Sequence, residues 1–562
     1  MRRTGGALTN NGGGGRRRFR KDRSGTEFFD WRSSIIRVAR RRRKDEPLYV
    51  LLYKQKIRRS IHSCKVVISQ ASVVSPIGVI LPVLGSGFIF IHHGIHFVLH
   101  YHWRLVFTQD QNIFVLGAHK MKDKKLKDPA FYRSNIWRIA AYSRISIVIM
   151  QYIFNALIPD HQAQGVFISP ALHDNDDTSI GRTVTYILGG FLRWDAQYFH
   201  HIYRYGYTYE NTLAFFPLYP NVLRLITAIF PGHSNTMFLI AAVVFNNLIF
   251  VFTALVLFGL TLRIHNNIEM AYNSTVLFCF NPASVFFSAP YSESLFVFTT
   301  FYGMYHIAYG NIWKSSLLFG LSVLNRSNGL LNVGFLLYYM IQLAVKERKI
   351  SFKCLFGTCF VFACFSLFQI YGYYKFCTLQ EHTLEPKVID YAIKNNLVIP
   401  NNNSVPLWCG VRLPYSYVQE KYWNNIGFLS YFQFKQIPNF LLASPCIFIL
   451  LKFGFEYFCN NNIIYLSLRN RDKLDFVYVV HSTFLTIFSL FCIHVQVATR
   501  MLSSSSPVFY WACANYYKFP LNFNKITYNR IMYSFKSKLV ILYYCTYFIV
   551  GTALFVNFLP FT

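Results

Sequence analysis

The sequence predicts an all-α polytopic membrane protein with about eight to eleven transmembrane helices. Of its 562 residues, 53% are hydrophobic and 19% are aromatic, which is more than a soluble core requires. Apolar windows of about 20 residues recur along most of the chain, and basic runs flank several of them. The pattern favours one polytopic domain, residues 138–562, over the several soluble domains that the length alone would suggest.

Residues 1–137 are predicted to form a basic N-terminal extension with an apolar stretch at 66–102. Residues 1–138 contain 28 Lys and Arg against 8 Asp and Glu, so they carry +20 of the net charge of +32. Arginine runs of this kind suit nucleic-acid binding or a nuclear signal. Because membrane spans follow, the positive-inside rule favours a disordered cytosolic tail, and we expect no nucleic-acid partner.

Histidines and cysteines offer two further patterns. His92, His96 and His100 recur at helical spacing, which is compatible with a metal site. No HExxH glutamate or nearby carboxylate accompanies them, so we expect interfacial histidines and no metal. Among twelve cysteines without a CxxC pattern, Cys377 and Cys409 bracket a long polar loop and could pair if that loop lies in an oxidising lumen.

Charge runs set the expected topology. The lysine-rich segment 115–138 should stay cytosolic, so the span at 139–159 should emerge in the lumen at Asp160. The cluster KERKISFK at 346–353 should also be cytosolic. That would place the loop 378–436, with its sequon at Asn402, on the luminal side with Asp160 and Asp195. Further apolar segments fall at 213–230, 237–262, 271–289, 291–309, 314–345, 354–377, 437–458, 475–499 and 538–558.

Ionisable groups at the edges of these spans are the candidate functional residues, because charge in or beside a bilayer is costly. They are Asp160 and His161 after the first span, the triplet Arg193, Trp194 and Asp195 in GGFLRWDAQYF, Glu293 in SAPYSESLF, and Arg326 in VLNRSNG. Each also has a structural interpretation, as a helix cap or as a side chain that reaches the membrane surface. Asp160 and Asp195 are less easily explained in that way, because the expected topology places both on one face.

No Rossmann or P-loop nucleotide-binding motif is present: the chain has no GxGxxG after a strand and no GxxxxGK. A membrane enzyme without such a motif could take its substrates from lipid carriers. Sugar transfer from a lipid phosphate needs a base, and a carboxylate can serve. It also needs a cation or hydrogen-bond donors for the departing phosphate. Residues 160–220 offer carboxylates, Trp194 and many tyrosines, which is compatible with this chemistry.

From about residue 138 onward, the chain resembles a known family. The matching segments are FNALIPDH (154–161), RWDAQYF (193–199), GYTYENTLAFFPLYP (206–220), NPASVFFSAPYSESLF (281–296), RSNGLLNVGFL (326–336), PYSYVQEKYWNNIGFLSYFQFKQIPNFLLASP (414–445), HVQVATRMLSSSSPVFYW (494–511) and the terminal NFLPFT. These segments resemble the second mannosyltransferases of glycosylphosphatidylinositol (GPI) anchor synthesis, the PIG-V family. Residues 1–130 have no counterpart in that resemblance and could be a genuine extension or a mis-joined segment.

The resemblance implies a C-type glycosyltransferase fold with luminal loops, in the endoplasmic reticulum membrane. It implies dolichyl-phosphate mannose as donor, the one-mannose GPI precursor as acceptor, and an α-1,6-linked product formed with inversion. Asp160 or Asp195 would be the base. The residues expected to bind substrate are His161, Arg193, Trp194, Glu210, Glu293 and Arg326.

Neither a cofactor nor a metal is needed for such a reaction, and a small accessory membrane subunit is an expected partner. The alternatives are a polytopic transporter, because intramembrane charges and broken helices also suit transport, or a different mannosyltransferase that uses the same donor.

Overall fold

The computed structural model describes residues 129–561, apart from 164–165, 174–177, 230–233, 350, 379–383, 401–405, 411–412, 424–425, 461–473 and 518–534. Three features of the sequence lie outside these residues: almost all of the basic extension, the three histidines at 92, 96 and 100, and the sequon at Asn402. The first described helix begins at Pro129, within the predicted extension.

Within the described residues every regular element is helical, as the sequence predicts. The long and medium helices are α5 (Pro129–Leu157), α9 (Asn235–His265), α10 (Ile268–Cys279), α11 (Glu293–Ala308), α12 (Ile312–Asn325), α13 (Val333–Glu347), α14 (Phe352–Cys377), α17 (Ile437–Asn460), α19 (Phe476–Phe491) and α23 (Phe535–Val556). The short ones are α6 (Ser179–Leu188), α7 (Asp195–Tyr205), α8 (Leu218–Thr227), α15 (Pro386–Lys394), α16 (Pro414–Tyr422), α20 (Ala498–Ser505) and α21 (Val508–Tyr516).

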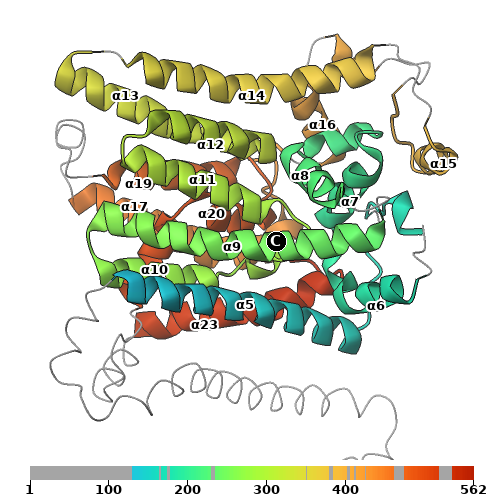
Figure 1. Cartoon of the computed structure of the whole chain (residues 1–562), viewed down its shortest axis with the longest axis horizontal. Coiled ribbons are helices and arrows are strands. Elements are labelled where there is room, and N and C mark those ends of the chain that lie inside the picture. The colour runs from blue at the N-terminus through green and yellow to red at the C-terminus, as the bar shows by residue number, and fades with distance from the viewer. Residues whose placement is uncertain are drawn as a thin grey trace, which may run out of the picture. The chain divides into compact units, whose positions relative to one another are not determined.

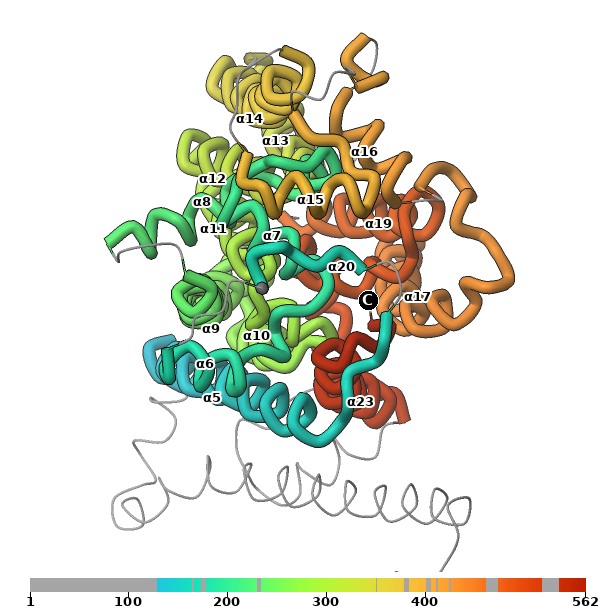
Figure 2. Tube along the Cα trace, turned by 90° about the vertical axis from the view of Figure 1, so that its right-hand side faces the viewer, coloured from blue at the N-terminus to red at the C-terminus, as the bar shows by residue number. Residues whose placement is uncertain are grey.

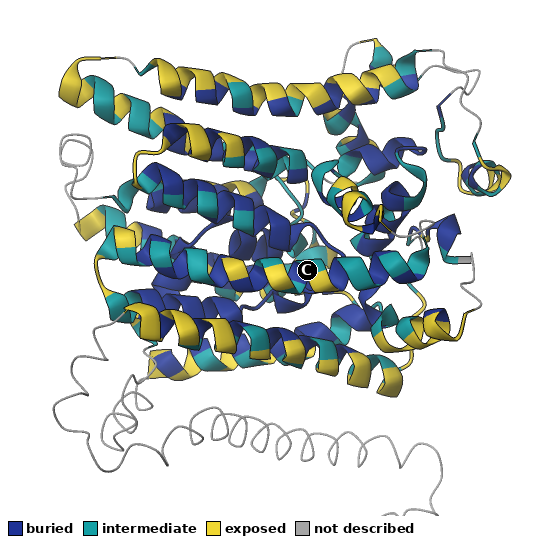
Figure 3. Cartoon of the chain, viewed as in Figure 1, coloured by how far each residue is buried: buried dark blue, intermediate teal, exposed yellow. Residues whose placement is uncertain are grey.

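The long helices run side by side in Figure 1, with α13 and α14 along one side, α5 and α23 along the other, and α9 to α12 between them. α9 follows from a nearly unbroken apolar run of 31 residues. It begins where the Ser234 side chain accepts a hydrogen bond from the Met237 amide, and it ends at Asn266 in the left-handed conformation. α10 and α11 are mostly buried, whereas α5, α9, α14 and α23 expose apolar side chains (Figure 3).

Five segments in the described part of the chain are long and apolar enough to cross a membrane: α9, Ser327–Glu347, α14, Phe434–Asn460 and α23. This is fewer than the eight to eleven spans predicted. The apolar windows at 291–309 and 314–345 form α11 and α12, of 16 and 14 residues, followed by a break before α13. At a rise of about 1.5 Å per residue, neither of these two helices reaches the ~30 Å of a bilayer core.

The short helices α6, α7, α8, α15 and α16 gather at one end of the long ones (Figure 1), and Figure 2 looks onto that end. α7 packs against α8, and α16 packs against the 3₁₀ turn η4 (Glu210–Ala214). Two short segments without regular helix lie beneath this end: residues 280–292, between α10 and α11, and the 3₁₀ turn η6 (Ser327–Asn332), between α12 and α13. These broken segments position the charged residues of the candidate site.

Candidate active site

The site is built around the junction that precedes α7. Trp194 has a φ of +54°, in the left-handed region, which is strained for a bulky residue and costs on the order of 1–3 kcal/mol. Tyr291 holds the junction in place. Its hydroxyl accepts a hydrogen bond from the Asp195 amide at 3.0 Å and donates one to the Arg193 carbonyl at 3.2 Å. The strained turn therefore aims Arg193 and Asp195 in set directions.

Asp195 is the first residue of α7, where the helix dipole favours a negative charge. Its side chain is 27% exposed, and its Oδ2 accepts a hydrogen bond from Arg500 Nη1 at 2.7 Å. Arg500 lies on α20, 305 residues away along the chain. The carboxylate thus remains partly open on one side while its other side is fixed by a guanidinium.

Glu293, the first residue of α11, lies behind this pair and is fully buried. Its Oε1 accepts a hydrogen bond from Arg326 Nη1 and lies 3.4 Å from Arg500 Nε. Asp195, Arg500, Glu293 and Arg326 therefore form one series of alternating charges, which we call the charge chain. The other carboxylate oxygen of Glu293 is buried without a hydrogen-bond partner, an uncommon state for a buried polar atom.

Arg500 is the residue of this group that the sequence analysis did not single out. Its guanidinium lies 5.1 Å from the ring centre of Phe286 and 5.6 Å from that of Tyr291. The signal was available, because Arg500 is a lone cation in the segment HVQVATRMLSSSSPVFYW between apolar runs. Only the fold, however, shows that this segment reaches α7.

Asp160 pairs with Arg193 on the other side of the same junction, at 2.9 Å between Oδ2 and Nη2. The Asp160 side chain is 49% exposed, the most open carboxylate of the group. Arg193 is held more tightly, and its pKa is lowered by burial, an effect that the charge of Asp160 opposes. Its remaining hydrogen bonds go to the side chain of Asn155 and to the carbonyls of Gly189 and Val556. Asp160 therefore pairs with the first residue of the fixed tripeptide Arg193–Asp195, and the second aspartate is the last residue of that tripeptide.

Two neighbours from the predicted set have smaller roles in this geometry. The side chain of His161 is exposed, and its amide donates to the carbonyl of Asn557. The Trp194 ring packs edge-to-face on Phe558 at 5.8 Å, and its indole N–H is buried without a hydrogen-bond partner.

Glu210 lies outside the charge chain. It is buried, and its carboxylate accepts hydrogen bonds from Trp408 Nε1 at 2.6 Å, Lys421 Nζ at 2.7 Å and the Tyr422 hydroxyl at 2.7 Å. We call these four residues the loop clasp, because it ties residues 386–423 to η4. Burial, and next the charge of Glu210, raise the pKa of Tyr422.

A disulfide joins Cys377, at the end of α14, to Cys409, with Cα atoms 5.7 Å apart. Cys409 is the neighbour of Trp408, so the disulfide and the loop clasp hold the same turn. The loop also touches η6, where the hydroxyls of Tyr415 and Ser327 are 2.7 Å apart. The described part of the segment 386–423 is therefore held near Arg326.

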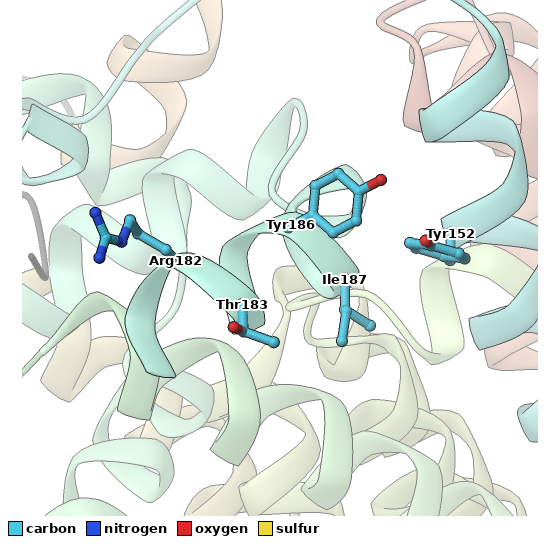
Figure 4. Close-up of a pocket in the computed structure, with 5 residues that line it drawn as sticks. All are labelled: Tyr152, Arg182, Thr183, Tyr186 and Ile187. Atoms are coloured by element: carbon cyan, nitrogen blue, oxygen red, sulfur yellow. The ribbon is translucent and has the colours of Figure 1, made fainter. Parts of the chain in front are cut away.

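A separate hollow of about 470 Å³ lies between α5 and α6 (Figure 4). It is lined by Tyr152, Arg182, Thr183, Tyr186 and Ile187. The described residues that line it include no carboxylate and thus no general base, so we place the candidate site at the charge chain instead. In the described part of the chain, no group of three or more His, Cys, Asp and Glu residues could hold a metal ion.

Comparison with known proteins identifies the family. The family model described as Mannosyltransferase (PIG-V) matches residues 133–562. GPI alpha-1,6-mannosyltransferase 2 of Cricetulus griseus is 33% identical over 497 residues, which cover 77% of this chain and 99% of that protein. GPI mannosyltransferase 2 of Drosophila pseudoobscura pseudoobscura is 35% identical over 460 residues, covering 76% and 99%.

Among solved structures, the oligosaccharyltransferase of Archaeoglobus fulgidus superimposes with a TM-score of 0.37 and 11% identity, over 74% of this chain and 55% of that one. That score is too low to support an argument about the fold. The family model and the relatives carry the assignment, and they favour mannosyl transfer over the transporter alternative. The chain belongs to the PIG-V mannosyltransferase family and is a mannosyl-transferring glycosyltransferase of GPI-anchor biosynthesis.

Proposed function

We propose that the protein transfers the second mannose, in α-1,6 linkage, from dolichyl-phosphate mannose to the one-mannose GPI precursor. The reaction would take place on the luminal side of the endoplasmic reticulum membrane. The linkage is supported by the names of relatives that match over 99% of their length. One observation supports the mechanism: Asp160 and Asp195 are both partly exposed, each pairs with an arginine, and both lie at the junction that precedes α7. A small accessory membrane subunit stays a prediction from the sequence.

The reaction is a single inverting displacement. An acceptor hydroxyl oxygen forms a bond to the anomeric carbon as the bond from that carbon to the phosphate oxygen breaks. The hydroxyl proton passes to an aspartate, and the electron pair leaves with dolichyl phosphate. We assign the base to Asp160, because its carboxylate is 49% exposed and an acceptor can reach it.

Asp195 is less suited to that role. Base and leaving group must lie on opposite faces of the reacting sugar, as in inverting glycosidases. Asp195 is 2.7 Å from Arg500, which is a candidate to bind the phosphate, so the two lie on the same side. Asp195 would then orient Arg500. Arg326 is 21% exposed and lies at the other end of the charge chain, where it could support the phosphate as well.

A groove of about 430 Å³ offers a place for the lipid chain of the donor. It is lined by Leu330, Leu331, Val333, Gly334, Tyr338, Phe362, Phe476, Val477, Val480, His481 and Phe484. Two of the lining residues, Leu330 and Leu331, belong to η6, the turn that begins next to Arg326. One short turn thus follows Arg326, at the cationic end of the charge chain, and lines the apolar groove, an arrangement that suits a hydrocarbon chain with a phosphate head.

The test is transfer from labelled dolichyl-phosphate mannose in microsomes of cells that lack the endogenous enzyme. Asp160→Asn should lower kcat by about 10²- to 10⁴-fold, because general base catalysis contributes that much. Asp195→Asn should raise the KM for the donor as well as lower kcat. Full activity in Asp160→Asn with loss only in Asp195→Asn would reverse the assignment, and full activity in both would end the aspartate-base mechanism. In cells without the protein, a one-mannose GPI precursor should accumulate; another intermediate would contradict the proposed step.

A further inference from the structure

Arg144 is a buried cation that the proposed mechanism does not use. It lies near the middle of α5, a helix of 29 residues that the sequence predicts to cross the membrane. Its side chain is almost fully buried, at 2% exposure. Burial of a charged side chain is costly unless hydrogen bonds or an opposite charge compensate it, so Arg144 calls for a specific function.

All hydrogen bonds from the guanidinium beyond its own helix go to one short stretch of chain. Nη1 donates to the Ser284 carbonyl at 2.9 Å and to Ser288 Oγ at 3.2 Å, while Nη2 donates to the Cys279 carbonyl at 3.2 Å and to Ser284 Oγ at 3.1 Å. The guanidinium also lies 3.8 Å from the ring centre of Phe250. Within the described residues no carboxylate pairs with it, so Arg144 binds neutral oxygens rather than a counter-ion.

These oxygens belong to residues 280–292, the connection between α10 and α11, which we call the 280–292 hairpin, and to Cys279, the last residue of α10. Nearly the whole hairpin is buried, and only η5 (Ser284–Phe287) within it is helical. Buried backbone without a regular ladder needs other hydrogen-bond partners, above all inside a membrane. Arg144 supplies them for Cys279, at the negative end of the α10 dipole, and for Ser284.

The same hairpin carries the contacts that shape the charge chain. Phe286 lies beneath the Arg500 guanidinium, Tyr291 fixes the Asp195 amide, and Glu293 follows directly as the first residue of α11. Its far half is held from α9, where Asn246 Nδ2 donates to the carbonyls of Ala289 and Tyr291. Arg144 fixes the near half.

We propose that Arg144 is a positioning residue for mannosyl transfer: it holds the 280–292 hairpin so that Tyr291 and Glu293 set the orientation of Asp195 and Arg500. The inference rests on the proposed function, because it assumes that the charge chain serves the transfer. An arginine is needed because its planar fork can bridge a helix end and the hairpin at once, whereas a lysine offers a single point of charge.

The test compares Arg144→Lys with a control in the same bundle, Thr261→Val. The control removes the hydroxyl that accepts a hydrogen bond from Trp511 Nε1 at 2.9 Å, away from the hairpin. Both variants should lower the melting temperature of the purified protein. For Arg144→Lys, kcat per folded molecule should also fall by about 10²-fold, as for a misplacement of about 1 Å, with both KM values little changed. Thr261→Val should keep the kcat of the wild-type protein.

A second variant covers the case in which Arg144→Lys does not fold. Ser288→Ala removes one of the Arg144 contacts, and with it the hydrogen bond from Ser288 to Asn247, and should give a smaller fall in kcat in the same direction. Arg144→Lys and Glu293→Gln together should lose less than the product of their separate effects, because they disturb one arrangement. If the wild-type protein transfers mannose normally and Arg144→Lys or Ser288→Ala has the same kcat per folded molecule, this inference is wrong while the proposed function stands. No transfer by the wild-type protein would defeat the proposed function.

Discussion

Two buried glutamates of this protein differ in how completely their carboxylates are hydrogen-bonded. Glu293 and Glu210 are both almost completely removed from solvent, and each contacts cationic side chains. Glu210 has a hydrogen-bond donor for each of its oxygens. Glu293 directs one oxygen at two arginines and leaves the other without a partner. Burial and charge are therefore alike, and the difference is in how completely the hydrogen bonds are satisfied.

The difference in hydrogen bonding distinguishes a structural contact, at Glu210, from a candidate functional site, at Glu293. A buried ion pair must recover a large desolvation cost, and a fully hydrogen-bonded carboxylate such as Glu210 recovers more of it than one with a free oxygen. The loop clasp therefore suits a structural task, which is to hold residues 386–423. The charge chain retains unused hydrogen-bonding capacity beside two partly exposed residues, Asp195 and Arg326, which suits a region that a charged substrate completes.

The largest effect that would sharpen this comparison is expected from Arg500→Ala. It leaves the carboxylates of Asp195 and Glu293 without their shared cation and removes the donor that we propose for the departing phosphate. Loss of one such donor costs about 10²- to 10³-fold in kcat, so transfer should fall at least that far. The measurement is transfer per folded molecule. Arg263→Ala, which removes an exposed cation stacked on Tyr309 at 4.9 Å, is the control. If both variants lost the same fraction of transfer, Arg500 would have no specific role in the reaction.

A smaller loss is expected from Glu293→Gln, because this residue acts through its arginines. The amide can still accept a hydrogen bond from Arg326 but no longer balances the charge of Arg500. We expect kcat to fall by about 10- to 10²-fold, through misplaced arginines, with normal expression. Glu210→Gln is the matched variant in the loop clasp. If the two substitutions lowered kcat equally, Glu293 could no longer be assigned to a functional site and Glu210 to a structural contact.

The sequence predicted the helical class, the junction at 193–195 and the polar breaks at Glu293 and Arg326, because charge in an apolar chain is conspicuous. It did not predict that Arg500 and Arg144 take part: Arg144 lies inside the predicted span at 139–159, and Arg500 lies just beyond the apolar segment 475–499, far along the chain from α7. Their significance depends on which helices meet. It grouped Glu210 with the substrate-binding residues, which stays a prediction, but it did not predict that the Glu210 carboxylate accepts hydrogen bonds from Trp408, Lys421 and Tyr422. Residue type and spacing could not show which lone pairs are already occupied.

The loop clasp itself should respond mainly in stability. In Glu210→Gln the hydrogen bond from Trp408 can persist, while the charge pair with Lys421 and the bond from Tyr422 are weakened. Because the Lys421 side chain is 36% exposed, the expected loss is modest, about 1–2 kcal/mol. Limited proteolysis of the folded protein should show faster cleavage within residues 386–423. Unchanged cleavage in Glu210→Gln would mean that the disulfide alone fastens the loop.

The smallest effect concerns His201, which lies beneath the loop clasp. Its ring stacks on Tyr209 at 4.4 Å, and its Nε2 lies 2.7 Å from Thr208 Oγ1. Burial, and next the neighbouring His200, lower the pKa of His201 to about 3. An unfolded histidine has a pKa of about 6.5, so between these values the unfolded state binds a proton that the folded state does not. Stability should therefore be lost as the pH falls below about 6.5, by up to ~1.4 kcal/mol per pH unit from this residue.

Thermal unfolding of the purified protein between pH 7.5 and 5.5 (values on the order of one unit either side of the histidine pKa) would show this slope. His201→Gln should flatten it, because glutamine does not titrate, although the variant starts from a lower melting temperature. His161→Gln is the control, since the His161 side chain is exposed, and this variant should keep the slope of the wild-type protein. An equal slope in wild-type protein and His201→Gln would mean that this ring takes up its proton as readily in the folded as in the unfolded state. The region beneath the loop clasp would then be open to water, and the contrast with the charge chain would rest on Glu210 alone.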